Sequence, residues 1–235
     1  PLKGQTLRGL GYNHAVISAR QDVQEPQAKS TSEYIACGEG FFEDFSTYHG
    51  RVFPRNDRWE DSYAYINSTW ADSMISLGVA TLDAYDQQGY PYYSADSRLV
   101  SSDTLTSLPF RFSGTPPAAL YFSFFFQAGG RGDLPEGIIP DSEGVTGEDS
   151  LIVDFYDPAD TLWIRKFYTL DNTQPHQFNI VEIPLSDTFR VDGFRVRFRN
   201  YTSLQRDILQ GTDMGQFGNA DMWHIDYIQI KTTAS

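Results

Sequence analysis

The sequence has very little cysteine and few basic residues for its size, and both shortages narrow the range of functions. Cys37 is the one cysteine among 235 residues, so the chain cannot form an internal disulfide. Lys and Arg together number 18 against 31 Asp and Glu, which gives a formal net charge of −13. Nucleic acids and anionic lipids bind basic surfaces, so neither is an expected partner. We expect Cys37 to be a small buried residue.

Long apolar runs and familiar catalytic motifs are also missing. No stretch of 18 apolar residues occurs, so we expect no transmembrane segment. The histidines are scattered, without the spacing on one strand or helix that a zinc site needs. There is no Gly-x-Ser-x-Gly elbow, no phosphate-binding loop and no Glu-x-Asp-x-x-Glu on one strand. These absences favour a protein that is not an enzyme, although carboxylates from different strands could still meet.

Aromatic residues, by contrast, are abundant, at 15% of the chain. They lie in short runs with β-branched residues, separated by Gly, Pro, Asp and Asn, which is typical of strands and turns. The runs predict strands at residues 63–67, 76–83, 120–127, 150–156, 162–168, 177–183, 193–201 and 222–230. Eight such strands predict an all-β fold, a two-sheet antiparallel jelly-roll sandwich with long loops. We expect residues 37–235 to form the sandwich and residues 1–36 to form an N-terminal arm.

One predicted strand alternates strictly between apolar and basic side chains. Its apolar positions are Phe194, Val196 and Phe198, and its basic positions are Arg195, Arg197 and Arg199. The apolar side chains must face the core, so we predict that the three arginines are exposed. Two roles stay open for them: pairing with carboxylates on neighbouring strands, or forming a face that binds an anion or a partner.

The last predicted strand, 222–230, is apolar on both faces. Alternation places Trp223, Ile225 and Tyr227 on one face and Ile228 and Ile230 on the other. A strand of this kind is covered on both sides, so we predict that Trp223 is a core residue.

Two long glycine-containing loops, 128–149 and 202–220, connect predicted strands. Loops on a rigid sandwich commonly carry function, so we expect partner contacts there, including contacts by Arg131 and Asp133. These two residues belong to an Arg-Gly-Asp tripeptide, which reaches integrins in animal matrix proteins. A glycine-rich turn with flanking charges is the alternative interpretation.

A further loop is rich in tyrosine. Tyr90, Tyr92 and Tyr93 lie close together in it and could stack on sugar rings. The alternative is that they pack within the loop.

Several landmarks occur in a fixed order from Phe41 onward. They are Phe42-Glu43-Asp44-Phe45, Arg58-Trp59-Glu60-Asp61, the apolar strand 121–126, the segment 149–155, Leu162-Trp163-Ile164 and the closing segment 223–228. Their order resembles the MAM/concanavalin-like jelly-roll superfamily.

Segments 194–201 and 221–228 also look like an envelope family of Bacteroidota that accompanies the type IX secretion machinery. That resemblance implies a protein of the periplasm or outer membrane that docks on and plugs the barrel of the secretion translocon. The competing hypothesis is a carbohydrate-binding or adhesion module on the cell surface.

The jelly-roll resemblance also implies a structural calcium ion, held where an acidic residue of the opening strand meets one of the closing strand. The candidates are Glu43 or Asp44 with Asp226. A lone buried carboxylate is very costly, and Ca²⁺ binds carboxylate and carbonyl oxygens. The alternative is that these acids face solvent or accept backbone N–H hydrogen bonds.

Overall fold

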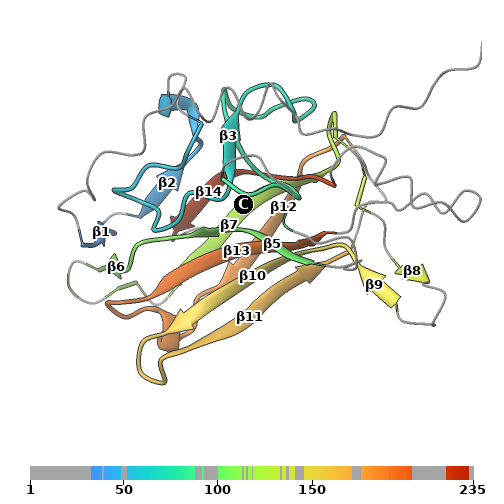
Figure 1. Ribbon diagram of the computed structural model, residues 1–235. Helices are drawn as coiled ribbons and strands as arrows, with labels where there is room; N and C mark the ends of the chain where they lie inside the picture. The colour runs from blue at the N-terminus through green and yellow to red at the C-terminus, as the bar shows by residue number, and fades with distance from the viewer. Residues whose placement is uncertain are drawn as a thin grey trace, which may run out of the picture.

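Two large antiparallel sheets lie against each other in the computed structural model, as Figure 1 shows. The structure describes residues 33–38, 40–48, 52–87, 92, 100–112, 114, 116–117, 119–132, 134–135, 138–140, 146–170, 176–202 and 221–232. The strands are β1 (Ile35–Ala36), β2 (Phe41–Glu43), β3 (Tyr65–Asn67), β4 (Val79–Leu82), β5 (Val100–Thr106), β6 (Phe110–Arg111), β7 (Tyr121–Ala128), β8 (Ile138–Pro140), β9 (Thr146–Glu148), β10 (Ser150–Asp157), β11 (Leu162–Thr169), β12 (Asn179–Pro184), β13 (Arg195–Thr202) and β14 (Trp223–Lys231). Two short 3₁₀ turns, η1 (Ser46–Tyr48) and η2 (Asp187–Phe189), are also present.

The strand order mixes segments that lie far apart in the sequence. The smaller sheet has the order β11-β10-β13-β5. The larger sheet has the order β12-β7-β14-β4-β3, and β2 pairs with β14 beside it. Neighbours within both sheets run antiparallel. The predicted jelly-roll sandwich is therefore confirmed.

Phenylalanine rings fill the space between the sheets. Phe122 and Phe124 of β7 point toward the smaller sheet, where they meet Phe155 of β10 and Phe198 of β13. The ring centres of Phe122 and Phe155 are 5.3 Å apart, and those of Phe124 and Phe198 are 5.0 Å apart, both in edge-to-face geometry. Each such pair contributes about 0.5–1.5 kcal/mol beyond simple burial. This dense core makes the outer sheet faces rigid.

All eight predicted strands are present, with small shifts at their ends. The prediction missed the short strands β1 and β6, and also β8 and β9, which pair with each other inside the segment predicted as the loop 128–149. It also missed β5, whose sequence Val-Ser-Ser-Asp-Thr-Leu-Thr carries almost no apolar signal. This strand forms through its pairing with β13, which is irregular between Arg199 and Tyr201.

The predicted faces of the last strand are wrong beyond Asp226. A β-bulge between Asp226 and Gln229 interrupts the pairing of β14 with β7. Tyr227 adopts a left-handed backbone conformation at the bulge, with φ of 53°. The bulge returns Ile228 and Ile230 to the buried face that Trp223 and Ile225 share, and it turns Tyr227 outward against Phe42 and Phe125.

Trp223 and Cys37 are both buried, as predicted. Burial raises the pKa of the Cys37 thiol to about 11, which makes it inert at neutral pH. Residues 1–32 of the predicted arm lie outside the described residues. At the end of that arm, Ile35 and Ala36 pair with β6 of the sandwich.

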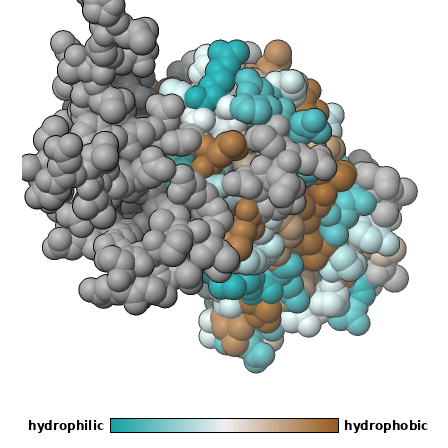
Figure 2. All heavy atoms as spheres, turned by 90° about the vertical axis from the view of Figure 1, so that its right-hand side faces the viewer, coloured by the Kyte–Doolittle hydropathy of each residue, from teal (hydrophilic) through white to brown (hydrophobic). Residues whose placement is uncertain are grey.

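Within the described residues, no helix has the length and apolar character that crossing a membrane requires. Figure 2 shows hydrophobic residues interspersed with hydrophilic ones on the face that it presents. Scattered apolar residues are normal on protein surfaces, so this view by itself singles out no binding site.

Candidate functional site

The outer face of the smaller sheet carries an ordered set of aromatic and basic side chains, which we call the platform. It consists of Tyr156, Trp163, Tyr168, Arg165, Arg195, Arg197, Arg199 and Asp154. The strand pairing arranges these residues in rows across β11, β10 and β13. Alternation directs them away from the core, and a β-bulge in the β10–β11 pairing, at Val153 and Asp154, brings Tyr168 to the same face as Trp163 and Arg165. The first row is Trp163, Tyr156 and Arg195, the second is Arg165, Asp154 and Arg197, and the third is Tyr168, Ile152 and Arg199.

Asp154 holds the centre of the platform in place. Its Oδ2 atom lies 2.8 Å from Arg197 Nη2 and 2.7 Å from Arg199 Nε. Burial opposes ionisation of Asp154 most strongly, but the hydrogen bonds and charges of Arg199 and Arg197 together outweigh it and hold its pKa below the ordinary value. One carboxylate thus fixes two guanidiniums.

Two arginines of β13 also contact the aromatic rings. The Arg197 guanidinium lies over the Trp163 ring, 4.3 Å from its centre, and Arg195 lies 5.4 Å from the same ring. Arg195 also donates to Glu60 and to the carbonyl of Ser107. The ring centres of Tyr156 and Trp163 are 5.2 Å apart. The platform is therefore a preorganised surface rather than a set of free side chains.

The prediction that the three arginines are exposed is wrong. Their side chains are 18%, 27% and 16% exposed for Arg195, Arg197 and Arg199. The alternation itself is confirmed, because Phe194, Val196 and Phe198 are buried. Pairing with Asp154 and Glu60 and stacking on Trp163 cover the arginines, and sequence spacing alone could not identify these partners.

Arg197→Glu is therefore expected to lower the free energy of unfolding by about 2 kcal/mol, since it removes a charged hydrogen bond and sets a second carboxylate beside Asp154. Chemical denaturation at pH 7 measures this effect. Arg165→Glu is the matched control, because Arg165 is exposed on the edge strand and should change stability by no more than about 0.5 kcal/mol. Equal stability of the two variants would show that the Asp154 pairs contribute nothing.

Arg131 lies apart from the platform. Its backbone N–H donates to the carbonyl of Trp70, and its side chain is 3.5 Å from Asp72. Asp72 also contacts His176, at 2.6 Å, and its backbone hydrogen-bonds to Gln127 of the larger sheet. The structure thus does not bring Arg131 together with the arginines of β13. Asp133 lies outside the described residues.

Of the three loop tyrosines, the structure describes Tyr92. Its hydroxyl donates to the buried carboxylate of Asp103 at 2.7 Å, and burial together with that carboxylate raises its pKa. Tyr92 thus packs within the protein, which supports the alternative interpretation. Tyr90 and Tyr93 lie outside the described residues.

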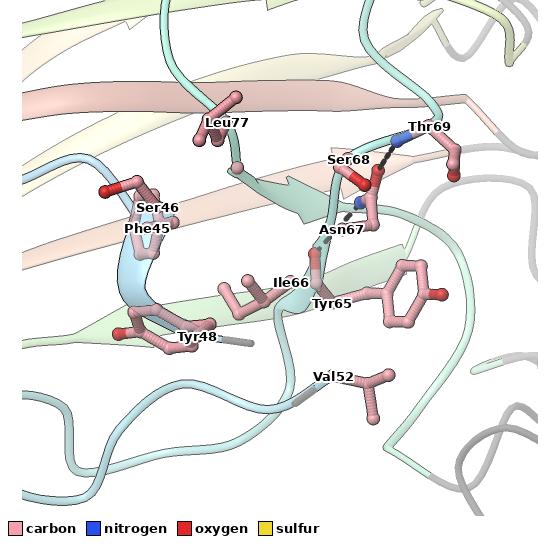
Figure 3. A pocket seen from close by; sticks show the side chains of 11 residues that line it. Phe45, Ser46, Tyr48, Val52, Tyr65, Ile66, Asn67, Ser68, Thr69 and Leu77 are labelled. Atoms are coloured by element: carbon pink, nitrogen blue, oxygen red, sulfur yellow. Dashed lines mark hydrogen bonds between the residues drawn. The ribbon is translucent and has the colours of Figure 1, made fainter. Parts of the chain in front are cut away.

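A hollow of about 370 Å³ lies on the other side of the molecule, beside β3 (Figure 3). Its lining includes Phe45, Tyr48, Tyr65 and Leu77. The side chain of Asn67 faces it, but its amide nitrogen donates to Thr81 and its oxygen accepts two backbone N–H bonds. The Asn67 amide is therefore already engaged, although Ser46, Ser68 and Thr69 also line the hollow and make it polar as well as apolar.

The predicted calcium ligands do not act as one group. Glu43 is buried, where it accepts a hydrogen bond from the Phe45 N–H at 3.0 Å and pairs with Arg58 at 3.2 Å. Asp44 accepts from the N–H and the hydroxyl of Ser46. In the described part of the chain, no three His, Cys, Asp or Glu side chains form a group that could hold a metal.

Asp226 does lie among oxygen atoms that suit a cation. Ser76 Oγ is 3.1 Å from Asp226 Oδ1, 2.7 Å from the Asp44 carbonyl and 2.8 Å from the Gly78 carbonyl. A hydroxyl has one proton, so it can donate to one of these acceptors at a time. The second carboxylate oxygen, Oδ2, is buried without a hydrogen-bond partner. Asp226 thus has oxygen neighbours of the kind that calcium binds, Glu43 is paired elsewhere with Arg58, and calcium stays a prediction.

No protein-family model and no curated protein matches the chain. Among solved structures it is similar to CBM27-1 of Caldicellulosiruptor saccharolyticus in complex with mannohexaose, with a TM-score of 0.41, 10% identity, and coverage of 84% of this chain and 99% of that one. It is also similar to a proposed glycoside hydrolase from Bacteroides vulgatus, with a TM-score of 0.36, 9% identity, and coverage of 82% and 85%. These likenesses concern the fold and do not identify a ligand. Neither of these two likenesses bears on type IX secretion.

Proposed function

We propose that this protein is a non-catalytic carbohydrate-binding module and that the platform is its binding surface. The observation that carries the proposal is the placement of Trp163, Tyr156 and Tyr168 on one outer sheet face, among fixed arginines and carboxylates. Aromatic rings pack against the apolar face of a sugar ring, while guanidinium and carboxylate groups bind its hydroxyls. A surface with both features, on a rigid sheet, suits an extended glycan.

Preorganisation strengthens the proposal. Ordering a long side chain upon binding costs about 0.5–1.5 kcal/mol. Arg197 and Arg199 are already held by Asp154, and Arg197 also stacks on Trp163. A glycan arriving at the platform therefore meets side chains that need little further ordering.

The test begins with a glycan array, followed by calorimetry on the best-binding oligosaccharide. Trp163→Ala is expected to weaken binding at least about tenfold, which corresponds to roughly 1.4 kcal/mol. Tyr168 is 39% exposed, so Tyr168→Ala should disturb the fold less than Trp163→Ala does. It should also weaken binding.

Leu77→Ala is the control, because Leu77 is 78% exposed beside the hollow of Figure 3, away from the platform. Its affinity should match that of the parent protein. Loss of binding with Leu77→Ala, and none with Trp163→Ala or Tyr168→Ala, would move the site to the hollow and overturn the proposal.

Docking on the outer-membrane secretion translocon stays the competing prediction of function. A location in the periplasm or at the outer membrane also stays a prediction. Co-purification from envelope extracts distinguishes the two functions. A membrane barrel retained by the parent protein and equally by Trp163→Ala, with no binding on the glycan array, would favour docking.

A further inference from the structure

The platform carries more positive than negative charge, in a protein that is strongly acidic as a whole. Its guanidiniums are those of Arg165, Arg195, Arg197 and Arg199, and the carboxylates on or beside it are those of Asp154, Glu60 and Asp61. Among the residues that the structure describes, four positive groups thus face three negative ones here, whereas the whole chain has a net charge of −13. The platform is a local basic surface against the general charge of the molecule.

Existing ion pairs do not use all of this positive charge. Asp154 is shared by two arginines, so one negative charge serves two positive ones. Arg195 pairs with Glu60. In the part of the chain that the structure describes, Arg165 makes no ion pair, and its guanidinium lies 5.4 Å from the centre of the Tyr168 ring.

Asp61 adds little competition for these arginines. Its Oδ2 accepts hydrogen bonds from the Thr104 hydroxyl at 2.8 Å and from the Thr106 N–H at 3.0 Å. Its carboxylate is therefore engaged with β5 at the edge of the platform rather than with a guanidinium. The surplus charge lies over β11 and β13, next to the exposed ring of Tyr168.

We infer that the platform binds a glycan whose sugars carry carboxylate groups, such as a polymer of uronic acid. This inference rests on the carbohydrate-binding function proposed above. A guanidinium presents parallel N–H donors that match both oxygens of a carboxylate, and such charged hydrogen bonds are about twice as strong as neutral ones. The aromatic rings bind the sugar rings, and Arg165 with the Arg197–Arg199 pair binds the carboxylates.

A matched pair of ligands tests this inference. Oligogalacturonate and its fully methyl-esterified form share the same sugar rings and differ in the charge of the carboxyl groups. Calorimetry at about 0.1 M salt limits charge effects to roughly 10 Å, so the distant acidic surface contributes little. We expect the acidic form to bind at least about tenfold more tightly than the ester.

Variants locate the effect on the platform. Arg165→Gln should reduce the preference for the acidic form at least about threefold. Arg131→Gln makes the same change of charge at a loop beside the other sheet, and it should leave the preference unchanged. Both positions are exposed, so neither change should alter folding.

The possible failures are distinct. Equal affinity for the acid and the ester, with both lost in Trp163→Ala, would overturn the inference and keep the carbohydrate-binding function. Preference for a sulfated oligosaccharide over oligogalacturonate would overturn the choice of carboxylate. Absence of binding to every glycan, acidic or neutral, would overturn the carbohydrate-binding function and the inference together.

Discussion

Trp223→Ala is expected to lower the free energy of unfolding by about 3–5 kcal/mol, the typical cost of removing a large aromatic side chain from a core. Trp223 is fully buried on β14, paired with Leu82 of β4 on one side and Ala128 of β7 on the other. Its ring lies 6.1 Å from that of Phe126. Denaturation in guanidinium chloride measures the change.

Trp163→Ala is the matched control, since it makes the same change at the surface of the molecule. Trp163 is half-buried on the edge strand β11 and belongs to the platform rather than to the core. Its loss should cost much less than that of Trp223. A Trp223→Ala protein as stable as Trp163→Ala would contradict the central place of β14 in the sandwich.

Asp226→Asn is expected to make the protein more stable at pH 8 in the presence of a chelator, by about 2–4 kcal/mol. Burial, which outweighs hydrogen bonds from Tyr227 and Ser76, raises the pKa of Asp226 to about 7. The pKa of an aspartate in an unfolded chain is about 4. Between these values the folded protein keeps a proton that the unfolded chain has lost. The stability from this group is therefore complete below about pH 4 and is lost as the pH rises through 7.

Thermal melting from pH 5 to pH 8 follows this loss. The parent protein should lose stability over this range by an amount that Asp226→Asn does not. A variant that is less stable than the parent in chelator at pH 8 would show that the ionised carboxylate is stabilised without a metal ion.

If the oxygen atoms around Ser76 hold calcium, the ion should remove the stability advantage that Asp226→Asn has over the parent protein in chelator. A ligand that binds the folded state alone raises its stability. Millimolar calcium should then raise the melting temperature of the parent at pH 8 and leave Asp226→Asn unchanged. Identical melting curves of the parent in calcium and in chelator would remove calcium from this site.

The candidate site shows how far sequence patterns reach. Alternation identified the outward face of β13, because a period of two is a local property that the residues themselves carry. The partners of its arginines were not visible in the same way. Asp154 is 43 residues from Arg197 in the sequence, and Trp163 belongs to a different strand again.

The sequence by itself determined the strand-rich character of the chain, the position of eight strands and the burial of Trp223 and Cys37. These follow from local composition and period. Tertiary structure alone decided three further features: the formation of the polar strand β5, the bulge that turns Tyr227 outward, and the neighbours of Asp226. Each depends on which strands become adjacent and in what register. Such pairings are stabilised by contacts between distant residues, and no local pattern of side chains specifies them.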